Sequence, residues 1–210
     1  MNPPRRILLT ALVLAPLLAR AQGRDPGFSF SELKLAQPVE TPGRIEVIEF
    51  FWYGCPHCYS LEPAIDAWLK KLPADVEFRR VPAVLSQNWV AHAQVYFAFE
   101  ALGALARLHR PFFDAIHRDR LRIDNQAAFD QWLQKQGVEP KKFVEVARSF
   151  GVESRVKRAA QISAIYGIDG VPALAVHGRY TVSAEQGGSR EGMLRTVDYL
   201  IGVVRKSQSK

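Results

Sequence analysis

The two cysteines of the 210-residue chain are three positions apart, in the segment Cys55-Pro56-His57-Cys58. If this segment opens a helix, the two sulfurs lie on one face and are close enough to form a disulfide. Cys55 would lie at the helix N-terminus, where unpaired N–H groups and the helix dipole favour an anion. We therefore predict a nucleophilic Cys55 whose thiol pKa is below its ordinary value of about 8.5, and a deeper, resolving Cys58.

Three interpretations of the cysteine pair stay open. A redox-active disulfide needs an attacking and a resolving sulfur side by side. A purely structural disulfide would close a loop of only two residues and would stabilise the fold little. Half of a zinc site would need two further ligands at suitable spacing; the candidate histidines are scattered along the chain: His92, His109, His117 and His177. A pair placed after a strand and at the start of a helix favours the redox-active disulfide.

The elements around the pair predict a β-α-β unit. Residues 45–53 are β-branched and aromatic, which is typical of a buried strand. A helix should follow over residues 56–72 and bend at Pro63. Residues 76–81 alternate in polarity and indicate a second strand, joined to the first by the helical crossover. A short strand candidate at residues 28–35 precedes the unit.

The following residues predict helices and then a return to strands. Apolar residues recur at helical spacing in five stretches: 89–102, 107–117, 126–136, 141–149 and 152–166. Glycines lie where helices would stop: Gly103, Gly137, Gly151 and Gly167. We assign one aromatic group to the core of this block: Trp89, Tyr96, Phe97 and Phe99. Residues 173–182 predict a hairpin with its turn at His177-Gly178, and residues 190–204 a final helix. The fold class is therefore α/β, a small domain with a helical insertion.

These motifs resemble a known family. The segment from Glu49 to Cys58 is similar to the active-site segment of DsbA-type thiol:disulfide oxidoreductases, and Gly170-Val171-Pro172-Ala173 resembles their loop with a cis-proline beside the sulfurs. The resemblance covers residues 27–205 and implies a thioredoxin fold with a helical insertion. It divides the chain into a signal peptide (1–21), a first thioredoxin part (22–85), the insertion (86–166) and a second thioredoxin part (167–210). The Pro-His pair between the cysteines is typical of the oxidase branch.

The resemblance also implies roles for the neighbours of the cysteines. Pro56 and His57 form the pair that sets the redox direction, and a charged or hydrogen-bonding His57 would add to the stabilisation of the Cys55 thiolate. Val171 and a cis-Pro172 would keep backbone groups available to an extended substrate chain. The plainer alternatives are a solvated His57 and a trans Pro172.

Glu49 shares a strand face with the apolar residues Ile45, Val47 and Phe51, so its carboxylate should be buried. A buried carboxylate needs a partner or holds a proton for chemistry. The family has an acid here that accepts or relays a proton as the deeper cysteine reacts, and its partner is a lysine where this chain has Arg80. Because arginine stays charged, we expect Arg80 to hold Glu49 ionised more firmly. The alternative is a Glu49 at an exposed strand edge.

The predicted function is oxidation of cysteine pairs in exported proteins, in which the Cys55–Cys58 disulfide is donated through a mixed disulfide and no other cofactor is needed. The resemblance implies two partners: unfolded exported polypeptides with free thiols, and a membrane quinone-linked protein that reoxidises the pair. It also implies a monomer. The alternatives are a reductase or isomerase on the same fold, and a peptide-binding chaperone whose disulfide is only structural.

Residues 1–21 predict an export signal, with Arg5 and Arg6 before an apolar run and a cleavage site at Ala19-Arg20-Ala21. A retained anchor is the alternative. Export would place the protein in the periplasm, where disulfides persist. Without this leader the 28 basic residues become 25 against 21 acidic ones, a net charge of +4. This mild surplus is spread along the chain, so we expect no nucleic-acid partner. A content of 48% hydrophobic and 23% charged residues excludes a disordered chain.

Overall fold

A computed structural model describes residues 27–208 and contains a five-stranded sheet. The strands lie in the order β1 (Ser31–Glu32), β5 (Tyr180–Ser183), β4 (Ala173–Val176), β2 (Ile45–Phe51) and β3 (Val76–Pro82). Strand β2 pairs in parallel with β3 and antiparallel with β4. All seven residues of β2 are buried, because the strand is central and both faces of the sheet are covered. The predicted β-α-β unit is therefore confirmed.

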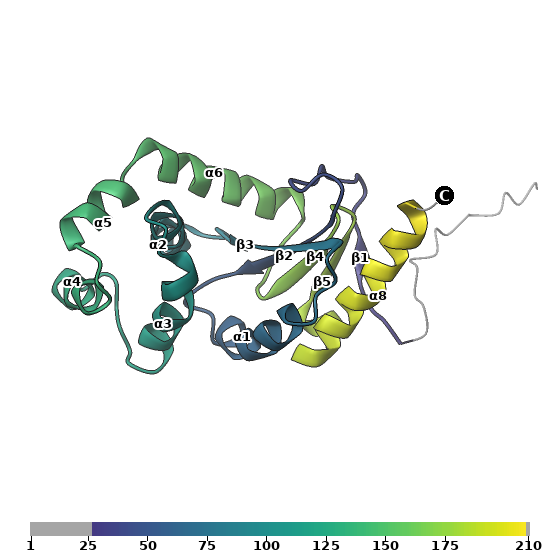
Figure 1. The fold of residues 1–210 in the computed structure, drawn as a ribbon, viewed down its shortest axis with the longest axis horizontal. Helices are drawn as coiled ribbons and strands as arrows, with labels where there is room; N and C mark the ends of the chain where they lie inside the picture. Colours follow the sequence, from purple (N-terminus) through teal and green to yellow (C-terminus); the bar gives the residue numbers. More distant parts are fainter. Residues whose placement is uncertain (1–26, 209–210) are drawn as a thin grey trace, which may run out of the picture.

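Helices cover the two faces of the sheet (Figure 1). Helices α1 (Pro56–Leu69) and α8 (Arg190–Gln208) pack on one face, where Ile45 and Val47 meet their apolar side chains. Helix α6 (Phe150–Ile165) covers the other face, where Ile48 and Phe50 pack against residues such as Ala159. This opposite placement follows from the alternation of side chains along β2. The site at the end of β2 is thus held between two helical layers.

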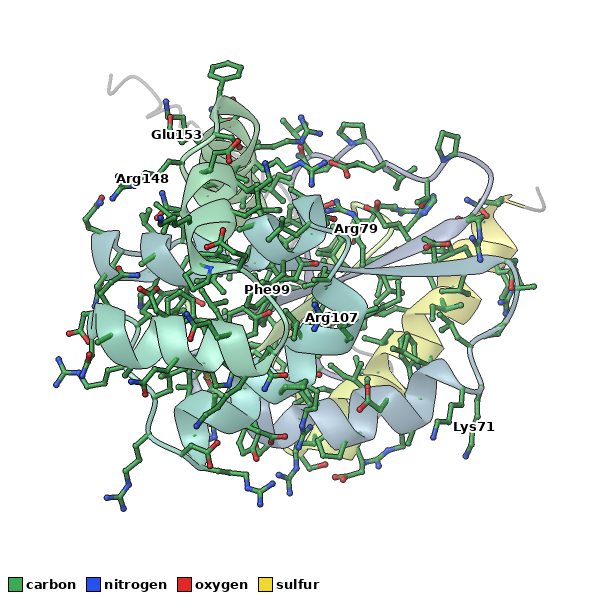
Figure 2. All side chains as sticks on the ribbon, turned by 60° about the vertical axis from the view of Figure 1, so that its left-hand side comes forward. Lys71, Arg79, Phe99, Arg107, Arg148 and Glu153 are labelled. Carbon is green, nitrogen blue, oxygen red and sulfur yellow. The ribbon has the colours of Figure 1, made fainter. Side chains whose placement is uncertain are left out.

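A group of helices lies between β3 and β4 in the chain: η1 (Gln87–Trp89), α2 (Val90–Ala101), α3 (Leu105–His117), α4 (Gln126–Lys135), α5 (Pro140–Ala147) and α6. Their common core is aromatic, with Phe99, Phe112, Phe129 and Phe143 in ring contact. Figure 2 shows Phe99 inside this block. Such a core gives α2 and α3 a firm support beside the end of β2.

Two predictions for this block are wrong. Gly151 does not stop a helix: it lies in the first turn of α6, whose start is fixed by Ser149, because Ser149 Oγ accepts the Val152 N–H at 3.3 Å. Trp89 does not belong to the core of the block, since its ring stacks on Trp52 with centroids 4.5 Å apart. The predicted stops at Gly103, Gly137 and Gly167 are confirmed by their positive φ angles after α2, α4 and α6.

The short helix α7 (Ala184–Gly187) was not predicted, although Ser183 and Gln186 form a capping box there. No helix within residues 27–208 combines the length and the apolar character needed to cross a membrane. The predicted leader, residues 1–21, lies outside the described residues.

Candidate active site

Cys55 is the N-cap residue of α1. Its backbone is extended (φ −87°, ψ 116°), and its Sγ accepts the backbone N–H of Cys58 at 3.3 Å. Pro56 occupies the first turn, where its missing N–H has no consequence. Both thiols are free; Cys58 is fully buried, and Cys55 keeps 6% of its surface exposed. The sulfur of Cys55 therefore lies at the helix start, as the sequence predicts.

The two sulfurs have opposite acidities. The hydrogen bond from the Cys58 side chain, assisted by the backbone N–H groups of Cys58 and His57 and by the charge of His57, lowers the pKa of Cys55 to about 6 against the effect of burial. Burial, together with the hydrogen bond and charge of Cys55, raises the pKa of Cys58 well above its ordinary value. His57 itself is exposed and is the weakest of these influences on Cys55. The reduced pair thus favours a Cys55 thiolate beside a Cys58 thiol.

The loop before β4 lies directly against Cys55. The Val171–Pro172 peptide bond is cis, as expected from the resemblance. The carbonyl oxygen of Val171 lies 3.4 Å from Cys55 Sγ and accepts a hydrogen bond from the thiol. Val171 is only half-buried, whereas Pro172 is buried. The loop therefore presents a backbone segment beside the reactive sulfur.

Glu49 is fully buried in β2, so the alternative of an exposed strand edge is wrong. Its Oε2 accepts a hydrogen bond from Arg80 Nε of β3 at 2.9 Å, and its Oε1 has no hydrogen-bond partner among the described residues. The Nη2 of Arg80 turns instead to Glu62 of α1, 3.3 Å away. One guanidinium is therefore shared by two carboxylates.

The sharing of Arg80 decides the protonation of Glu49. Burial, helped by the nearby charge of Glu62, outweighs Arg80 and raises the pKa of Glu49 to about 8. Arg80 lowers this pKa, but not enough to keep Glu49 ionised at neutral pH, so the pair alone does not set the protonation of the acid. A charge on Glu49 would also contribute to the high pKa of Cys58. Glu49 can consequently hold a proton near neutral pH, within electrostatic reach of Cys58.

Sequence reasoning did not identify two further members of this buried cluster. Glu62 lies four positions after Cys58 and therefore on the same face of α1. Its Oε1 lies 3.4 Å from His109 Nε2 of α3, and His109 Nδ1 lies 2.8 Å from the hydroxyl of Tyr53. The spacing of Cys58 and Glu62 could have indicated Glu62, whereas no local signal connects His109 to the cysteines.

The segment between β2 and α1 is held in place by rings. Trp52 stacks on Trp89, and a Cβ at Gly54 would overlap the Trp52 indole, so only glycine fits there. His117 Nε2 donates to the carbonyl oxygen of Tyr53 at 2.8 Å. These contacts fix the chain immediately before Cys55.

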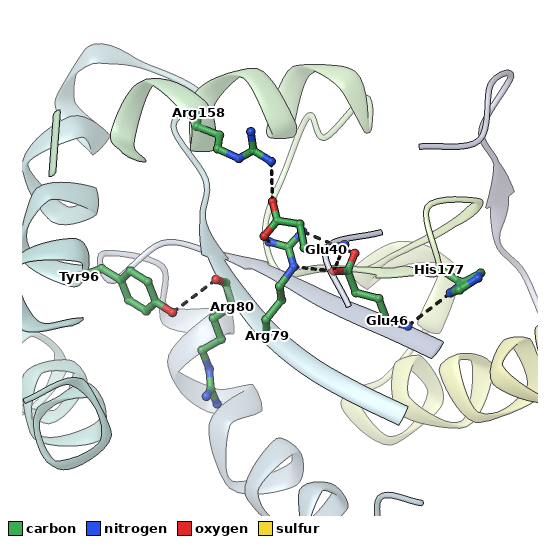
Figure 3. Close-up of polar contacts among 7 residues, drawn as sticks. All are labelled: Glu40, Glu46, Arg79, Arg80, Tyr96, Arg158 and His177. Atoms are coloured by element: carbon green, nitrogen blue, oxygen red, sulfur yellow. Dashed lines mark hydrogen bonds and ion pairs between the residues drawn. The ribbon is translucent and has the colours of Figure 1, made fainter. Parts of the chain in front are cut away.

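A second buried acid, Glu46, lies on the opposite face of β2 and was also missed. Its Oε2 accepts hydrogen bonds from Arg79 Nε at 2.9 Å and from the backbone N–H of Glu40 at 3.0 Å. Arg79 Nη2 reaches Oε1 at 3.5 Å, and Glu40 is itself paired with Arg158 (Figure 3). Glu46 thus belongs to a separate ion-pair network that ties residues 40–46 to β3 and α6.

Within the described part of the chain, no three His, Cys, Asp or Glu side chains are grouped in a way that could hold a metal ion. The functional groups of the site are the two sulfurs, the buried acids and the cis-proline loop.

Comparisons with known proteins agree with this geometry. Residues 74–195 match the family described as DSBA-like thioredoxin domain. The thiol:disulfide interchange protein DsbA of Azotobacter vinelandii is 38% identical over 97% of this chain and 100% of the relative, and that of Pseudomonas aeruginosa is 36% identical over 98% and 100%. The crystal structure of Pseudomonas aeruginosa DsbA superposes with a TM-score of 0.81 at 37% identity, covering 88% of this chain and 96% of that one. The oxidoreductase DsbA from Xylella fastidiosa gives 0.78 at 33% identity, covering 85% and 96%.

Proposed function

Since the chain belongs to the DsbA-like thioredoxin family and is a thiol:disulfide oxidoreductase, we propose that it oxidises cysteine pairs in exported proteins with its Cys55–Cys58 disulfide. The observation that carries the proposal is the position of Cys55 Sγ at the N-cap of α1, where it accepts the Cys58 N–H. Whatever stabilises the Cys55 thiolate stabilises the reduced protein, so loss of the disulfide to a substrate is favourable.

In the first step a substrate thiolate attacks Cys55 Sγ. A disulfide forms between the substrate and Cys55, the Cys55–Cys58 bond breaks, and its electron pair goes to Cys58 Sγ. The high pKa of Cys58 makes its thiolate basic, so it takes up a proton. Glu49, with a pKa of about 8, supplies this proton and later recovers one from the solvent.

In the second step another substrate thiolate attacks the substrate sulfur of the mixed disulfide. The substrate disulfide forms, and Cys55 leaves as a thiolate, for which its low pKa makes it a good leaving group. The substrate has then lost two electrons to the protein. One of its two protons is balanced by the proton on Cys58, and the other passes to the solvent.

The cis-proline loop is the proposed substrate-binding element. Val171 lies beside Cys55 and is only half-buried, so an extended chain placed along it would bring a cysteine to Cys55 Sγ. Pro56 and His57 form the exposed rim of the site. We assign catalysis to Cys55, Cys58 and Glu49 with support from this rim, and substrate binding to Val171 and Pro172.

The remaining elements of the proposal come from the sequence and from what the family resemblance implies. Cleavage near Ala21 would release the protein into the periplasm, where it acts as a monomer on unfolded polypeptides with free thiols. A membrane quinone-linked protein restores the disulfide after each cycle. The chemistry needs no cofactor besides the Cys55–Cys58 pair, because the disulfide itself carries the two electrons.

Two measurements test the proposed function. The thiolate absorbance of the reduced protein should titrate with a midpoint near pH 6, and a midpoint near the ordinary value of about 8.5 would contradict it. Equilibration with glutathione should give a potential more oxidising than about −180 mV, whereas a value near the −270 mV of thioredoxin would identify a reductase. A Cys55→Ser variant that still supports substrate oxidation would contradict the proposal and favour the alternative of a peptide-binding chaperone with a structural disulfide.

A further inference from the structure

His109 is a buried histidine that the proposed mechanism does not use. It lies on α3, only 7% of its surface is exposed, and its two ring nitrogens face polar groups of the thioredoxin part. Its Nδ1 is 2.8 Å from the hydroxyl oxygen of Tyr53, and its Nε2 is 3.4 Å from Glu62 Oε1. Nε2 makes no regular hydrogen bond to any residue in the range 27–208, so Glu62 is the acceptor that it faces.

The two contacts together select one tautomer of the ring. A neutral imidazole has one N–H donor and one acceptor nitrogen. The Glu62 carboxylate can only accept when it is ionised, whereas the Tyr53 hydroxyl can donate or accept. Burial raises the pKa of Tyr53 well above its ordinary value, so the hydroxyl keeps its proton. The consistent arrangement has Tyr53 donating to Nδ1 and Nε2–H directed at Glu62.

The surroundings of Glu49 and Glu62 make this donor important. The two carboxylates share the single guanidinium of Arg80, with Nε on Glu49 and Nη2 on Glu62. The other titratable or charged groups that act on the cluster come from three helices and the segment after β2: Tyr53, Cys58 and Asp66, Tyr96, and Arg110. Two acids that share one cation in a buried site cannot both be ionised at low cost, so one of them keeps a proton.

We propose that His109 is a positioning residue, which directs the shared proton of this acid pair to Glu49 by stabilising the ionised form of Glu62. This inference rests on the proposed function, because a proton on Glu49 is what Cys58 receives when the disulfide opens. His109 touches neither sulfur and acts through Glu62. The insertion thus contributes a group to the acid–base chemistry of the thioredoxin part.

The acidities and the access of solvent agree with this assignment. The close approach of the His109 ring and the charge of Arg80 outweigh burial and lower the pKa of Glu62, while the pKa of Glu49 is raised. A hollow of about 650 Å³ is lined by Glu62, Arg80 and His109 but not by Glu49. Without the Nε2–H donor, Glu62 is therefore the acid that solvent would protonate first, and Arg80 would then serve Glu49 alone.

The experiment is a carboxyl titration by NMR on the reduced, full-length mature protein labelled with ¹³C at glutamate Cδ. Glu49→Gln and Glu62→Gln variants assign the two signals. In His109→Leu, the pKa of Glu49 should fall by about one unit or more and that of Glu62 should rise. A shift of this size is expected when a charge-assisted contact is lost. His109→Gln is the matched control, since its amide can donate to Glu62 and accept from Tyr53, and it should retain the wild-type order.

The same variants should move the pH profile of disulfide exchange in parallel with the Glu49 titration. A Glu49 titration that is unchanged in His109→Leu, or shifted equally by Leu and Gln, overturns the proposal. If the Leu variant does not fold, ¹⁵N shifts of the wild-type ring decide: an Nε2–H tautomer supports the proposal and an Nδ1–H tautomer overturns it. The carboxyl and ring signals do not depend on oxidase activity, so a failure of the proposed function remains distinguishable.

Discussion

Strands β2 and β3 carry two glutamate–arginine pairs in neighbouring positions, one on each face of the sheet. Glu46 and Arg79 meet on the α6 side, and Glu49 and Arg80 on the α1 side. Both glutamates are fully buried, and both accept an arginine Nε–H at 2.9 Å. The pairs differ in what surrounds them. Both oxygens of Glu46 have partners and a backbone N–H is added, whereas one oxygen of Glu49 has no partner among the described residues.

This difference separates a structural ion pair from a chemical one. Glu46 has an arginine with two contacts and a backbone donor, so its charge is compensated within its own face of the sheet (Figure 3). Glu49 shares its arginine with Glu62, and its pKa is raised to about 8. The same two residue types therefore give a structural network in one place and a proton store in the other. Arg79 is also shared, with Glu40, but Glu40 has a second arginine in Arg158, so the number of cations available to each pair of acids decides which.

The largest expected effect is on stability and concerns the structural pair. Glu46→Leu should lower the free energy of unfolding by about 3 kcal/mol, because it leaves Arg79 without its buried partner. Urea unfolding measures the loss, and the exchange rate of the folded protein should not change. Glu40→Gln is the control, since it removes the more exposed acid beside Arg79 and should cost less than about 1 kcal/mol. Equal losses in both variants would contradict the assignment.

Glu49→Gln should have its main effect on rate. The amide cannot supply a proton, and we expect disulfide exchange in stopped-flow experiments to slow by about 100-fold. Near pH 4, where Glu49 holds its proton, the change in stability should stay below about 1 kcal/mol, since glutamine replaces a carboxylic acid of similar shape. Glu46→Gln is the matched control and should leave the rate alone. An unchanged rate in Glu49→Gln would make Glu49 as structural as Glu46.

The two pairs should also differ in the pH dependence of stability. The pKa of Glu49 is raised to about 8 in the folded protein, above its unfolded value of about 4.3, so the folded state binds the extra proton between these values. The contribution of Glu49 to stability is full below pH 4.3 and is lost as the pH rises through 8, by at most about 1.4 kcal/mol per pH unit.

Denaturation of a Cys55→Ser/Cys58→Ser protein between pH 5 and 8 measures this slope without the thiols. Adding Glu49→Gln should flatten the curve, whereas adding Glu46→Gln should not. A curve that Glu46→Gln flattens instead would reverse the roles of the two acids.

The smallest effects are expected at the arginines. Arg79→Lys loses a two-point contact with Glu46 and should cost about 1–2 kcal/mol. Arg80 contacts Glu49 and Glu62 through one nitrogen each. A lysine in its place can keep one of these two contacts, so Arg80→Lys should lower the free energy of unfolding by only about 0.5–1 kcal/mol. Thermal unfolding of both variants provides the comparison, and a greater loss in Arg80→Lys would show that Glu49 is the better-held acid.

The comparison also explains what the sequence could predict. The helix start at Cys55 and the burial of Glu49 follow from local patterns, and the pairing of Glu49 with Arg80 is what the family resemblance implies; all three are observed. Glu46 was missed although residues 45–53 predict a buried strand, because its partners Arg79 and Glu40 meet it only through the packing of residues 40–46 against β3. Glu62 and His109 meet through the packing of α3 on α1, a contact across 47 positions that no spacing encodes.

The protonation of Glu49 escaped prediction for a related reason. The family resemblance gives the nearest cation, Arg80, but an acid responds to every charge around it and to its loss of water. The second carboxylate on Arg80 belongs to α1, and its presence follows only from how the helix lies on the sheet. The raised pKa of Glu49 therefore depends on a third residue, while the pair with Arg80 is observed.

The sulfur that reacts is also the sulfur that caps a helix. As a thiolate, Cys55 closes the first turn of α1 by accepting the Cys58 N–H, but a sulfur bonded to Cys58 is a much poorer acceptor. Loss of an N-cap bond costs about 0.5–2 kcal/mol, so each redox cycle should loosen and retighten this turn. In the oxidised enzyme the first turn of α1 would then open more often, with faster amide exchange at residues 57–59. Incoming substrate chains would therefore bind the form whose active-site turn is less rigid.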